Sequence, residues 1–395
     1  MKYLVGVETF FPDKPGGAER VAWDFAQIMR NNGNDVTIFC SKQSPDAEDI
    51  SEYKGIKVVR FAIPKTKSLD PFKMHRQKTA GVAAARKYLG STHWDLVHIH
   101  IPLYGKILYE IFGDSPRYIY TVHSPIVMEQ EANWSAQGLT GKIKLLFGKR
   151  LLKNLEGSML RRVDCIHTLS EFTKQAIDKY YGVGNKVTVI PHWCRDGFWR
   201  QHSKTEARSK LGWPQDAKML FSIRRLAPRM GLDIAIKALA PLFKIYPDVI
   251  FALAGSGELE VPLKQLTHSL GVTDKVWFLG QVSDDTLKRC YEAADLFILP
   301  TRSLECFGLP VLEALAYGLP VISTDAAALP ELMGTILPEC IVSAGNVEEL
   351  RQKIQTYIEG KLNMPSHEVL ISYVKKNYDR NIISSRIVKL LEGKA

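Results

Sequence analysis

Strand-like and helix-like segments alternate along almost the whole chain, and this alternation constrains the fold more than any other feature. In the first half, we expect strands at 3–7, 36–40, 56–61, 96–100, 118–122, 165–169 and 187–190, and helices at 18–31, 78–89 and 171–181. The second half adds strands at 219–223, 249–254, 276–280, 294–300 and 320–324, and helices at 204–211 and 234–243. Such alternation predicts an α/β fold with doubly wound parallel sheets. Ligands of these sheets bind at the carboxyl ends of the strands.

A length of 395 residues suits two domains of ordinary size. The irregular, aromatic stretch Pro-His-Trp-Cys-Arg-Asp-Gly-Phe-Trp at 191–199 separates the two series of elements. We therefore predict one domain at 1–195 and a second at 196–377, facing each other across a cleft. A cleft between domains is a common ligand site.

Composition narrows the class of protein. A hydrophobic content of 46% is globular, and no apolar run is long enough to cross a membrane. The first residues turn acidic too soon for a signal peptide and are typical of a strand. Six scattered cysteines without a Cys-x-x-Cys pair argue for a reducing cytosol, and against a zinc site or a disulfide framework. We expect a cytoplasmic protein.

The net charge of +10 lies in the first half, where 29 Lys and Arg face 20 Asp and Glu; the second half has 23 against 22. This surface would attract phosphorylated acceptors or acidic lipid headgroups, and no motif for nucleic acid is present. Residues 142–162 hold seven basic residues and one acidic residue, with Phe147, Leu151, Leu155 and Met159 at helical spacing. Such a helix could lie on the inner face of an acidic membrane, or pack its apolar stripe on its own domain.

The stretch Glu305-Cys-Phe-Gly-Leu-Pro-Val-Leu-Glu313 predicts a loop followed by a helix, between two buried strands. Pro310 suits the first helical position and Gly318 suits the stop. A helix N-terminus at the carboxyl end of a strand can bind phosphate, and Glu313 could accept hydrogen bonds from sugar hydroxyls. The alternative is that both glutamates only complement the helix dipole.

Arg224, Arg225 and Arg229 follow the strand at 219–223 and precede a helix. They indicate an anion clamp, or alternatively salt bridges between domains. Gly255-Ser256-Gly257 ends the next strand, but a third glycine is missing, which argues against a dehydrogenase.

Three features of the first half lie at strand ends. Gly16 and Gly17 precede a helix and allow close approach of a phosphate or sugar, although most such pairs are only turns. His98 and His100 share one face of a strand but lack further metal ligands nearby. His123 ends the following strand, where it could touch a substrate or be purely structural.

The chain resembles the retaining glycosyltransferases of family 4. Four motifs carry this resemblance: the glutamate pair around Phe-Gly-Leu-Pro, the Arg-Leu-x-Pro-x-x-Gly segment, the Gly-Ser-Gly turn and the Gly-Gly loop. The resemblance covers nearly the whole chain and implies the GT-B fold of two facing Rossmann-like domains. It also implies a C-terminal helix, at about 378–395, that crosses back to the first domain.

The resemblance also implies roles for single residues. Glu313 would hold the donor ribose, Glu305 and His123 would lie beside the transferred sugar, and Arg225 would grip the diphosphate. A Lys is usual where this chain has Met230, so Arg229 would take its place, and Ala327-Ala328 stands where the family often has Gly-Gly. The implied catalytic set is His123, Glu305 and Arg225; the implied donor-binding set is Gly16, Gly17, Arg225, Arg229, Gly255, Gly257, Glu305, Phe307, Gly308, Leu309 and Glu313.

The implied reaction moves a sugar, with retention, from a nucleoside-diphosphate sugar, expected to be a UDP- or GDP-sugar, to an acceptor hydroxyl in glycan, glycolipid or polysaccharide synthesis. No acidic metal-binding motif is evident, so we expect neither a metal nor a cofactor. Expected partners are the donor, a lipid-linked or polysaccharide acceptor and an acidic membrane surface. The alternatives are a GT-B nucleotide-sugar epimerase or phosphorylase, and a non-catalytic nucleotide-sugar-binding protein.

Overall fold

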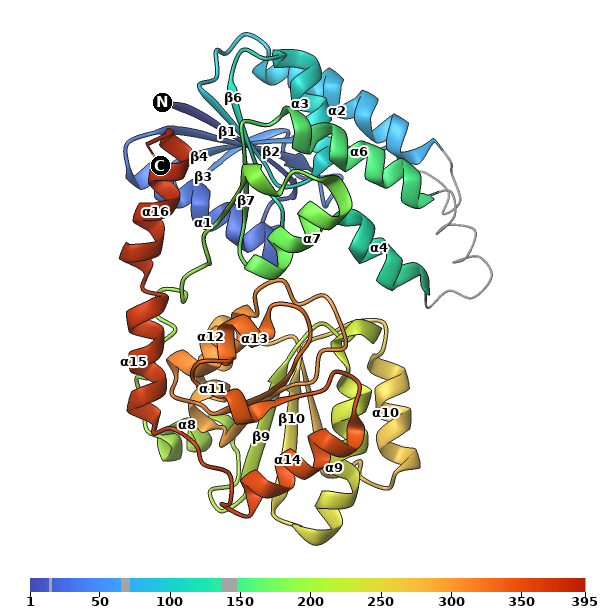
Figure 1. Cartoon of the computed structure of the whole chain (residues 1–395), viewed down its shortest axis with the longest axis vertical. Coiled ribbons are helices and arrows are strands. Elements are labelled where there is room, and N and C mark those ends of the chain that lie inside the picture. The colour runs from blue at the N-terminus through green and yellow to red at the C-terminus, as the bar shows by residue number, and fades with distance from the viewer. Residues whose placement is uncertain (14–15, 65–71, 136–147, 395) are drawn as a thin grey trace. The chain divides into compact units, whose positions relative to one another are not determined.

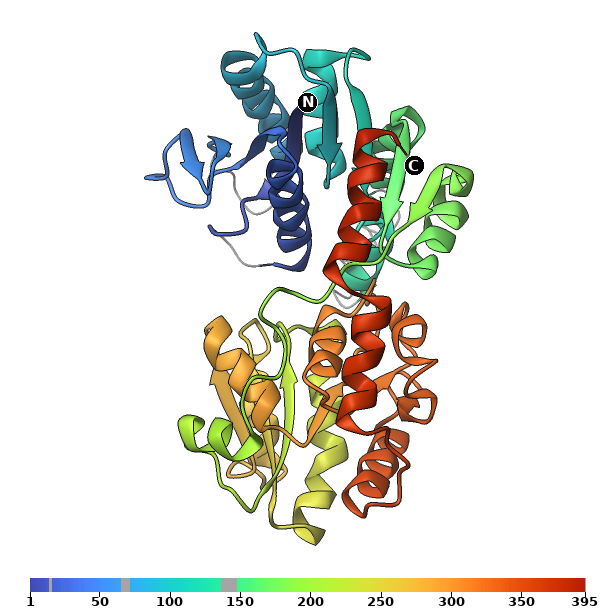
Figure 2. The same ribbon diagram turned by 90° about the vertical axis from the view of Figure 1, so that its left-hand side faces the viewer.

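The computed structural model describes residues 1–13, 16–64, 72–135 and 148–394. The chain divides into two compact units (Figures 1 and 2). Unit 1 comprises Met1–Pro191 with Asn381–Ala395, and unit 2 comprises His192–Arg380. Each unit is built on its own mainly parallel sheet, which confirms the predicted α/β class.

The sheet of unit 1 has the order β3-β4-β2-β1-β5-β6-β7-β8. Its strands are β1 (Lys2–Thr9), β2 (Asp35–Ser41), β3 (Ile50–Tyr53), β4 (Ile56–Phe61), β5 (Leu96–Ile99), β6 (Arg117–Thr121), β7 (Cys165–Thr168) and β8 (Val187–Val189). All neighbouring strands pair in parallel except β3 and β4. The order reverses between β1 and β5, so the loops after these strands diverge at this point and leave room for a ligand.

The helices of unit 1 are α1 (Gly17–Asn31), α2 (Lys73–Leu89), α3 (Pro102–Phe112), α4 (Ile126–Ser135), α6 (Lys149–Arg162), α7 (Glu171–Tyr181) and α16 (Arg380–Glu392), with the short turn η2 (Gly184–Lys186). Helices α2, α3 and α6 share one core with the sheet, whereas α1 packs against β1 and β2 from the other face. Helix α16 belongs to unit 1 (Figure 2). Arg117 donates to the carbonyls of Leu390 and Leu391 in this helix.

The basic segment at 142–162 is described only from residue 148 onward, and Phe147 lies outside the described residues. Within α6, Leu155 and Met159 are buried in the core of unit 1, whereas Leu151 is 57% exposed. Most of the described apolar stripe therefore packs on its own domain, as the second of the two interpretations expected.

Unit 2 has a sheet of order β11-β10-β9-β12-β13-β14, and its described strand pairs are parallel. The strands are β9 (Lys218–Ile223), β10 (Val249–Ala254), β11 (Val276–Gly280), β12 (Leu296–Leu299), β13 (Val321–Thr324) and β14 (Ile341–Val342). The side chains of β12 and β13 are all buried, and most of those of β9 and β10 are too, which explains why these strands are nearly continuous apolar runs in the sequence. The order reverses between β9 and β12.

Helices cover both faces of this sheet. They are α8 (Lys204–Leu211), α9 (Leu232–Ile245), α10 (Glu260–Ser269), α11 (Asp284–Ala293), α12 (Leu309–Ala316), α13 (Leu329–Met333), α14 (Val347–Ile358) and α15 (His367–Asn377), with the short turns η3 (Pro228–Met230) and η4 (Pro338–Cys340). Helices α9, α10 and α14 pack together, and α8 packs on α11 and α12 on α15 (Figure 1).

Candidate functional site

The loops at the switch point of unit 2 bring the predicted donor-site residues together. Strands β10, β9 and β12 are neighbours in the sheet, so the loops after them meet at one edge. These loops contain the Gly-Ser-Gly turn at 255–257, the arginine segment at 224–229, and the segment from 300 to 308 that leads into α12. This is the place where open α/β sheets bind ligands.

Glycines allow these loops to pack against one another. A Cβ on Gly255 would lie 1.9 Å from the carbonyl oxygen of Arg224, and one on Gly257 would lie 2.4 Å from that of Leu226. The Leu226 amide also donates to the Ser256 carbonyl over 2.9 Å. The described contacts thus explain why positions 255 and 257 are glycines: without side chains, Gly255 and Gly257 allow the arginine segment to pack against this turn.

Arg224, rather than Arg225, contacts Glu305. Arg224 Nη2 lies 2.7 Å from Glu305 Oε2, and the two side chains are 7% and 15% exposed. Its Nε is buried and makes no hydrogen bond to any described residue. Arg225, in contrast, is 69% exposed and lies 3.4 Å from Glu258. The buried guanidinium at this strand end is therefore that of Arg224.

Arg229 and Met230 make different contacts near Glu305. Arg229 Nη1 donates to the Leu304 carbonyl over 3.0 Å, next to Glu305. Met230 is buried, and its sulfur lies against Arg224. Arg229 therefore supports the backbone of the glutamate loop, and Met230 packs under the buried arginine.

The N-terminus of α12 follows directly from this loop. Gly308 is the N-cap residue, with φ of 100° and ψ of 46°, a left-handed conformation that favours glycine. Pro310 is the second residue of the helix, one position later than predicted, and has no N–H to leave unsatisfied. Phe307 is buried edge-to-face against Tyr378. The amides that begin this turn, including that of Leu309, are those a helix uses to bind an anion.

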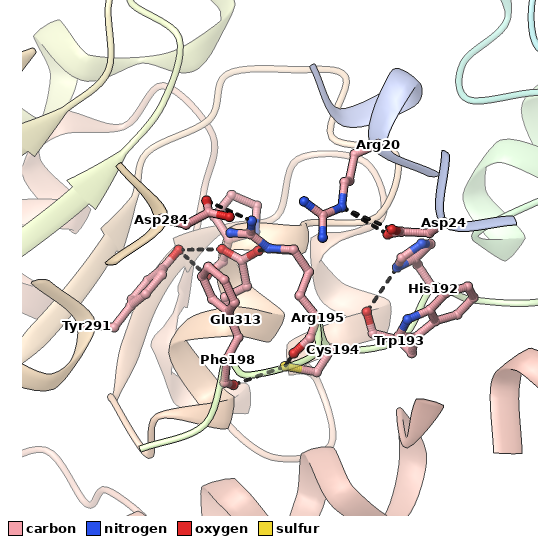
Figure 3. A network of polar contacts seen from close by, with 11 residues as sticks. Arg20, Asp24, His192, Trp193, Cys194, Arg195, Phe198, Asp284, Tyr291 and Glu313 are labelled. Carbon is pink, nitrogen blue, oxygen red and sulfur yellow. Dashed lines mark hydrogen bonds and ion pairs between the residues drawn. The ribbon is translucent and has the colours of Figure 1, made fainter. Parts of the chain in front are cut away.

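Glu313 lies one turn inside α12 and is held by two side chains (Figure 3). Arg195 Nε donates to its Oε1 over 2.5 Å, and the Tyr291 hydroxyl donates to its Oε2 over 2.9 Å. Burial opposes the charge of Arg195, but Glu313, Asp284 and Tyr291 together outweigh this effect, so the pKa of Arg195 is raised. The carboxylate is thus fixed in orientation as well as buried.

In unit 1, the loops after β1, β5 and β6 lie at one edge because these strands are neighbours. Gly16 is the N-cap of α1 and has an extended backbone. A Cβ on Gly16 would meet the Glu19 carboxylate at 2.2 Å, whereas no described residue lies within 4 Å of a Cβ on Gly17. Among the described residues, the start of α1 is therefore unobstructed on the Gly17 side.

His123 follows β6 and contacts His100, which follows β5. His100 Nδ1 lies 2.9 Å from His123 Nε2, and the two rings stack. His98 and His100 lie on the same side of the strand, with ring centroids 4.4 Å apart, as predicted. Burial holds the pKa of both His98 and His100 well below the usual value. His100 is therefore a neutral partner for His123.

Two residues beside these sites, Arg195 and Tyr291, have no role predicted from the sequence, and two others, Arg224 and His100, are predicted only as members of a group. Arg224 belongs to the predicted arginine clamp, and His100 to the predicted histidine pair, so the sequence signal was present for both. Arg195 and Tyr291 reach Glu313 from 118 and 22 residues away, and no local pattern reveals such contacts.

Two further observations concern the described part of the chain alone. No group of three or more His, Cys, Asp or Glu side chains there is arranged to hold a metal ion. None of its helices is both long and apolar enough to span a bilayer.

Comparison with known proteins identifies the family. The model described as Glycosyltransferase Family 4 matches residues 15–194, and that described as Glycosyl transferases group 1 matches residues 203–377. An uncharacterized glycosyltransferase of Methanocaldococcus jannaschii is 35% identical over 311 residues, which cover 76% of this chain and 75% of that protein.

Solved structures agree on the fold. Sucrose-phosphate synthase from Thermosynechococcus elongatus superimposes with a TM-score of 0.84 at 19% identity, covering 100% of this chain and 99% of that one. The Anabaena protein HepE, solved in complex with UDP-glucose, gives a TM-score of 0.76 at 20% identity, with both chains fully covered. The chain has the GT-B fold and belongs to the glycosyltransferases, in the family described by the Glycosyltransferase Family 4 and Glycosyl transferases group 1 models.

Proposed function

We propose that this glycosyltransferase moves a sugar, with retention of configuration, from a nucleoside-diphosphate sugar to an acceptor hydroxyl. The observation that carries the proposal is the pairing of buried Arg224 with Glu305 beside the N-terminus of α12. A cation and free helix amides at one strand edge suit a diphosphate. A UDP-sugar is the first donor to test, because the HepE structure holds UDP-glucose.

The difficult step in such a transfer is the departure of the nucleoside diphosphate, which carries at least two negative charges. Fixed donors aimed at the leaving group stabilise this charge as it develops. Arg224 is suited to this role because its buried Nε is unsatisfied by the described residues. Arg225, the match implied by the resemblance, is the alternative cation. These arginines and the helix amides would act without a metal ion.

The carboxylates have separate proposed roles. Glu305 would lie beside the transferred sugar, with its position set by Arg224 and by the loop that Arg229 supports. Glu313 would accept hydrogen bonds from the donor ribose. The backbone of Phe307, Gly308 and Leu309 would contact the sugar and the phosphate. In unit 1, the resemblance assigns Gly16 and Gly17 to the diphosphate and His123 to the transferred sugar, and we propose the same roles.

The acceptor side of the proposal depends on charge. The basic first half would favour a phosphorylated, lipid-linked or polysaccharide acceptor at the cytoplasmic face of a membrane. Flotation with acidic and neutral vesicles tests this part: equal binding to both kinds of vesicle would remove the electrostatic contribution.

One assay separates transfer from the alternative reactions. The chain is incubated with UDP- or GDP-sugars, with and without candidate acceptors, and the release of nucleoside diphosphate is followed. We expect release that depends on an acceptor, and a product whose anomeric configuration by NMR matches that of the donor. Conversion of the donor into an epimeric nucleotide sugar, without net release of nucleoside diphosphate, would indicate an epimerase. Dependence on inorganic phosphate would indicate a phosphorylase, and binding without turnover would indicate a sensor. An inverted product would refute retention.

A further inference from the structure

Arg195 stands in the segment that enters unit 2, ahead of α8, yet its guanidinium is largely buried. Its Nε donates to Glu313 Oε1 over 2.5 Å, and its Nη1 lies 3.2 Å from Asp284 Oδ1. The guanidinium also lies over the ring of Phe198, 3.5 Å from the centroid. Three residues therefore contact this side chain, and Figure 3 shows its contact with Glu313 of α12.

Tyr291 holds the other oxygen of the same carboxylate. Its hydroxyl donates to Glu313 Oε2 over 2.9 Å, and its ring is buried and stacked on Tyr317. Each carboxylate oxygen therefore receives one fixed donor. Because a carboxylate oxygen can accept two hydrogen bonds, each also retains a lone pair for a further donor. Such an arrangement fixes the direction in which those lone pairs point.

A glutamate that only offset the dipole of α12 would not need buried hydrogen-bond donors on both carboxylate oxygens. A glutamate that merely offsets a helix dipole can remain in solvent, without buried partners. Here Glu313 and Arg195 are 8% and 12% exposed. Desolvating two charges is costly, so the pair indicates that the orientation of this carboxylate matters.

We propose that Arg195 is a positioning residue which, together with Tyr291, aims Glu313 at the ribose hydroxyls of the donor and so makes the site select ribonucleosides. This inference rests on the proposed function, which assigns the ribose to Glu313. Arg195 itself does not touch the sugar. Its loss leaves the nucleotide's phosphate contacts intact but releases the carboxylate.

The test measures discrimination, which a merely structural role would not change. Binding of UDP, 2′-deoxy-UDP and 3′-deoxy-UDP, and of the three guanosine counterparts, is measured by calorimetry for the wild-type chain and for Arg195→Gln. A hydrogen bond to a charged group corresponds to roughly tenfold or more in affinity. We therefore expect the wild-type chain to prefer the ribose form over at least one deoxy form by about tenfold. In Arg195→Gln this ratio falls toward one, mainly through weaker binding of the ribose form.

Three further variants make the result decisive. Arg195→Lys keeps the positive charge and should retain part of the preference for the ribose form over the deoxy form. Tyr291→Phe removes only the second donor to Glu313 and should also narrow the ratio, which provides an independent test if Arg195→Gln fails to fold. Arg200→Gln is the matched control, because Arg200 lies in the same segment but donates to the Tyr317 carbonyl. This variant should keep the wild-type ratio.

Two results would overturn the inference in distinguishable ways. If Arg195→Gln weakens the ribose and deoxy forms by the same factor, or changes neither, Arg195 has no part in selecting the ribose, while the proposed function stands. If the wild-type chain binds neither the uridine nor the guanosine nucleotides, the proposed function fails and the role of Arg195 fails with it.

Discussion

Glu156 provides the most quantitative test of how unit 1 is stabilised. This glutamate of α6 is fully buried, and its Oε1 accepts from the Tyr120 hydroxyl over 2.8 Å. Its Oε2 accepts from the Ile126 amide at the start of α4 over 2.9 Å, and from the Tyr181 hydroxyl. Burial raises the pKa of Glu156 to about 7, although the hydrogen bonds from Tyr181, Tyr120 and Ile126 act in the opposite direction.

The expected effect on stability follows from this pKa. In the unfolded chain the carboxyl ionises near its ordinary pKa of 4.5, whereas in the folded chain it remains protonated up to about 7. The protonated carboxyl therefore contributes its full stabilisation of the folded state below pH 4.5, and this stabilisation is lost as the pH rises through about 7. One pKa unit corresponds to about 1.4 kcal/mol, so the total loss is about 3 kcal/mol.

Glu156→Gln removes the titration and keeps the shape. An amide offers one acceptor and one donor where the acid had two oxygens, so the variant has a constant offset at every pH. The difference in free energy of unfolding, variant minus wild type, should therefore increase by about 3 kcal/mol between pH 4.5 and pH 8. Urea unfolding followed by tryptophan fluorescence across this range measures the difference, from which the titration of all other groups cancels.

The control is Glu52→Gln, which makes the same substitution at an exposed glutamate of β3, outside the buried cluster around Glu156. A pH-independent difference for Glu156→Gln would refute the reasoning, because it would show that the buried carboxyl ionises as in water.

Two other predictions concern the loops and the histidine pair. Gly231→Ala should destabilise the chain well beyond Gly212→Ala in thermal unfolding: the two positions have nearly equal φ of 69° and 67°, but only at Gly231 would the Cβ meet a neighbour, the Pro300 carbonyl at 1.8 Å. Both variants share the backbone strain of an alanine at positive φ, about 1–3 kcal/mol. Equal losses of stability in the two variants would show that the contact with Pro300 relaxes freely. His100 should be neutral with its proton on Nδ1, donating to His123 Nε2, because its buried Nε2 has no acceptor among the described residues. Nitrogen-15 NMR of the imidazoles measures both tautomers at pH 6, and a proton on His123 Nε2 would contradict this assignment.

The central strands were predictable because most of their side chains are buried, whereas the edge strands β3 and β14, which are short, were not predicted. Segments such as β10 and β12 are nearly continuous apolar runs, and the helices between them begin or end at recognisable glycines, prolines and caps. The start of α12, with Gly308 and Pro310, is an example in which local chemistry alone indicates the element.

The partners within the site were less predictable. Arg224 and Arg225 are adjacent at the end of β9, and only the path of the following loop decides which one turns toward Glu305. Arg195 reaches Glu313 across 118 residues, a contact that depends on how the linker packs. Glu156 is the single acidic residue of a basic segment, and its burial depends on Tyr120 and Tyr181, which come from other elements.

The most direct test of the proposed site compares Arg224→Gln with Arg225→Gln in acceptor-dependent release of nucleoside diphosphate. If Arg224 neutralises the leaving group, Arg224→Gln should lower kcat by about a hundredfold or more, the usual cost of removing one such donor. Arg225→Gln should lower it by only a few fold, because that side chain lies largely in solvent. A large loss in Arg225→Gln with near-normal turnover in Arg224→Gln, or normal turnover in both variants, would contradict the assignment.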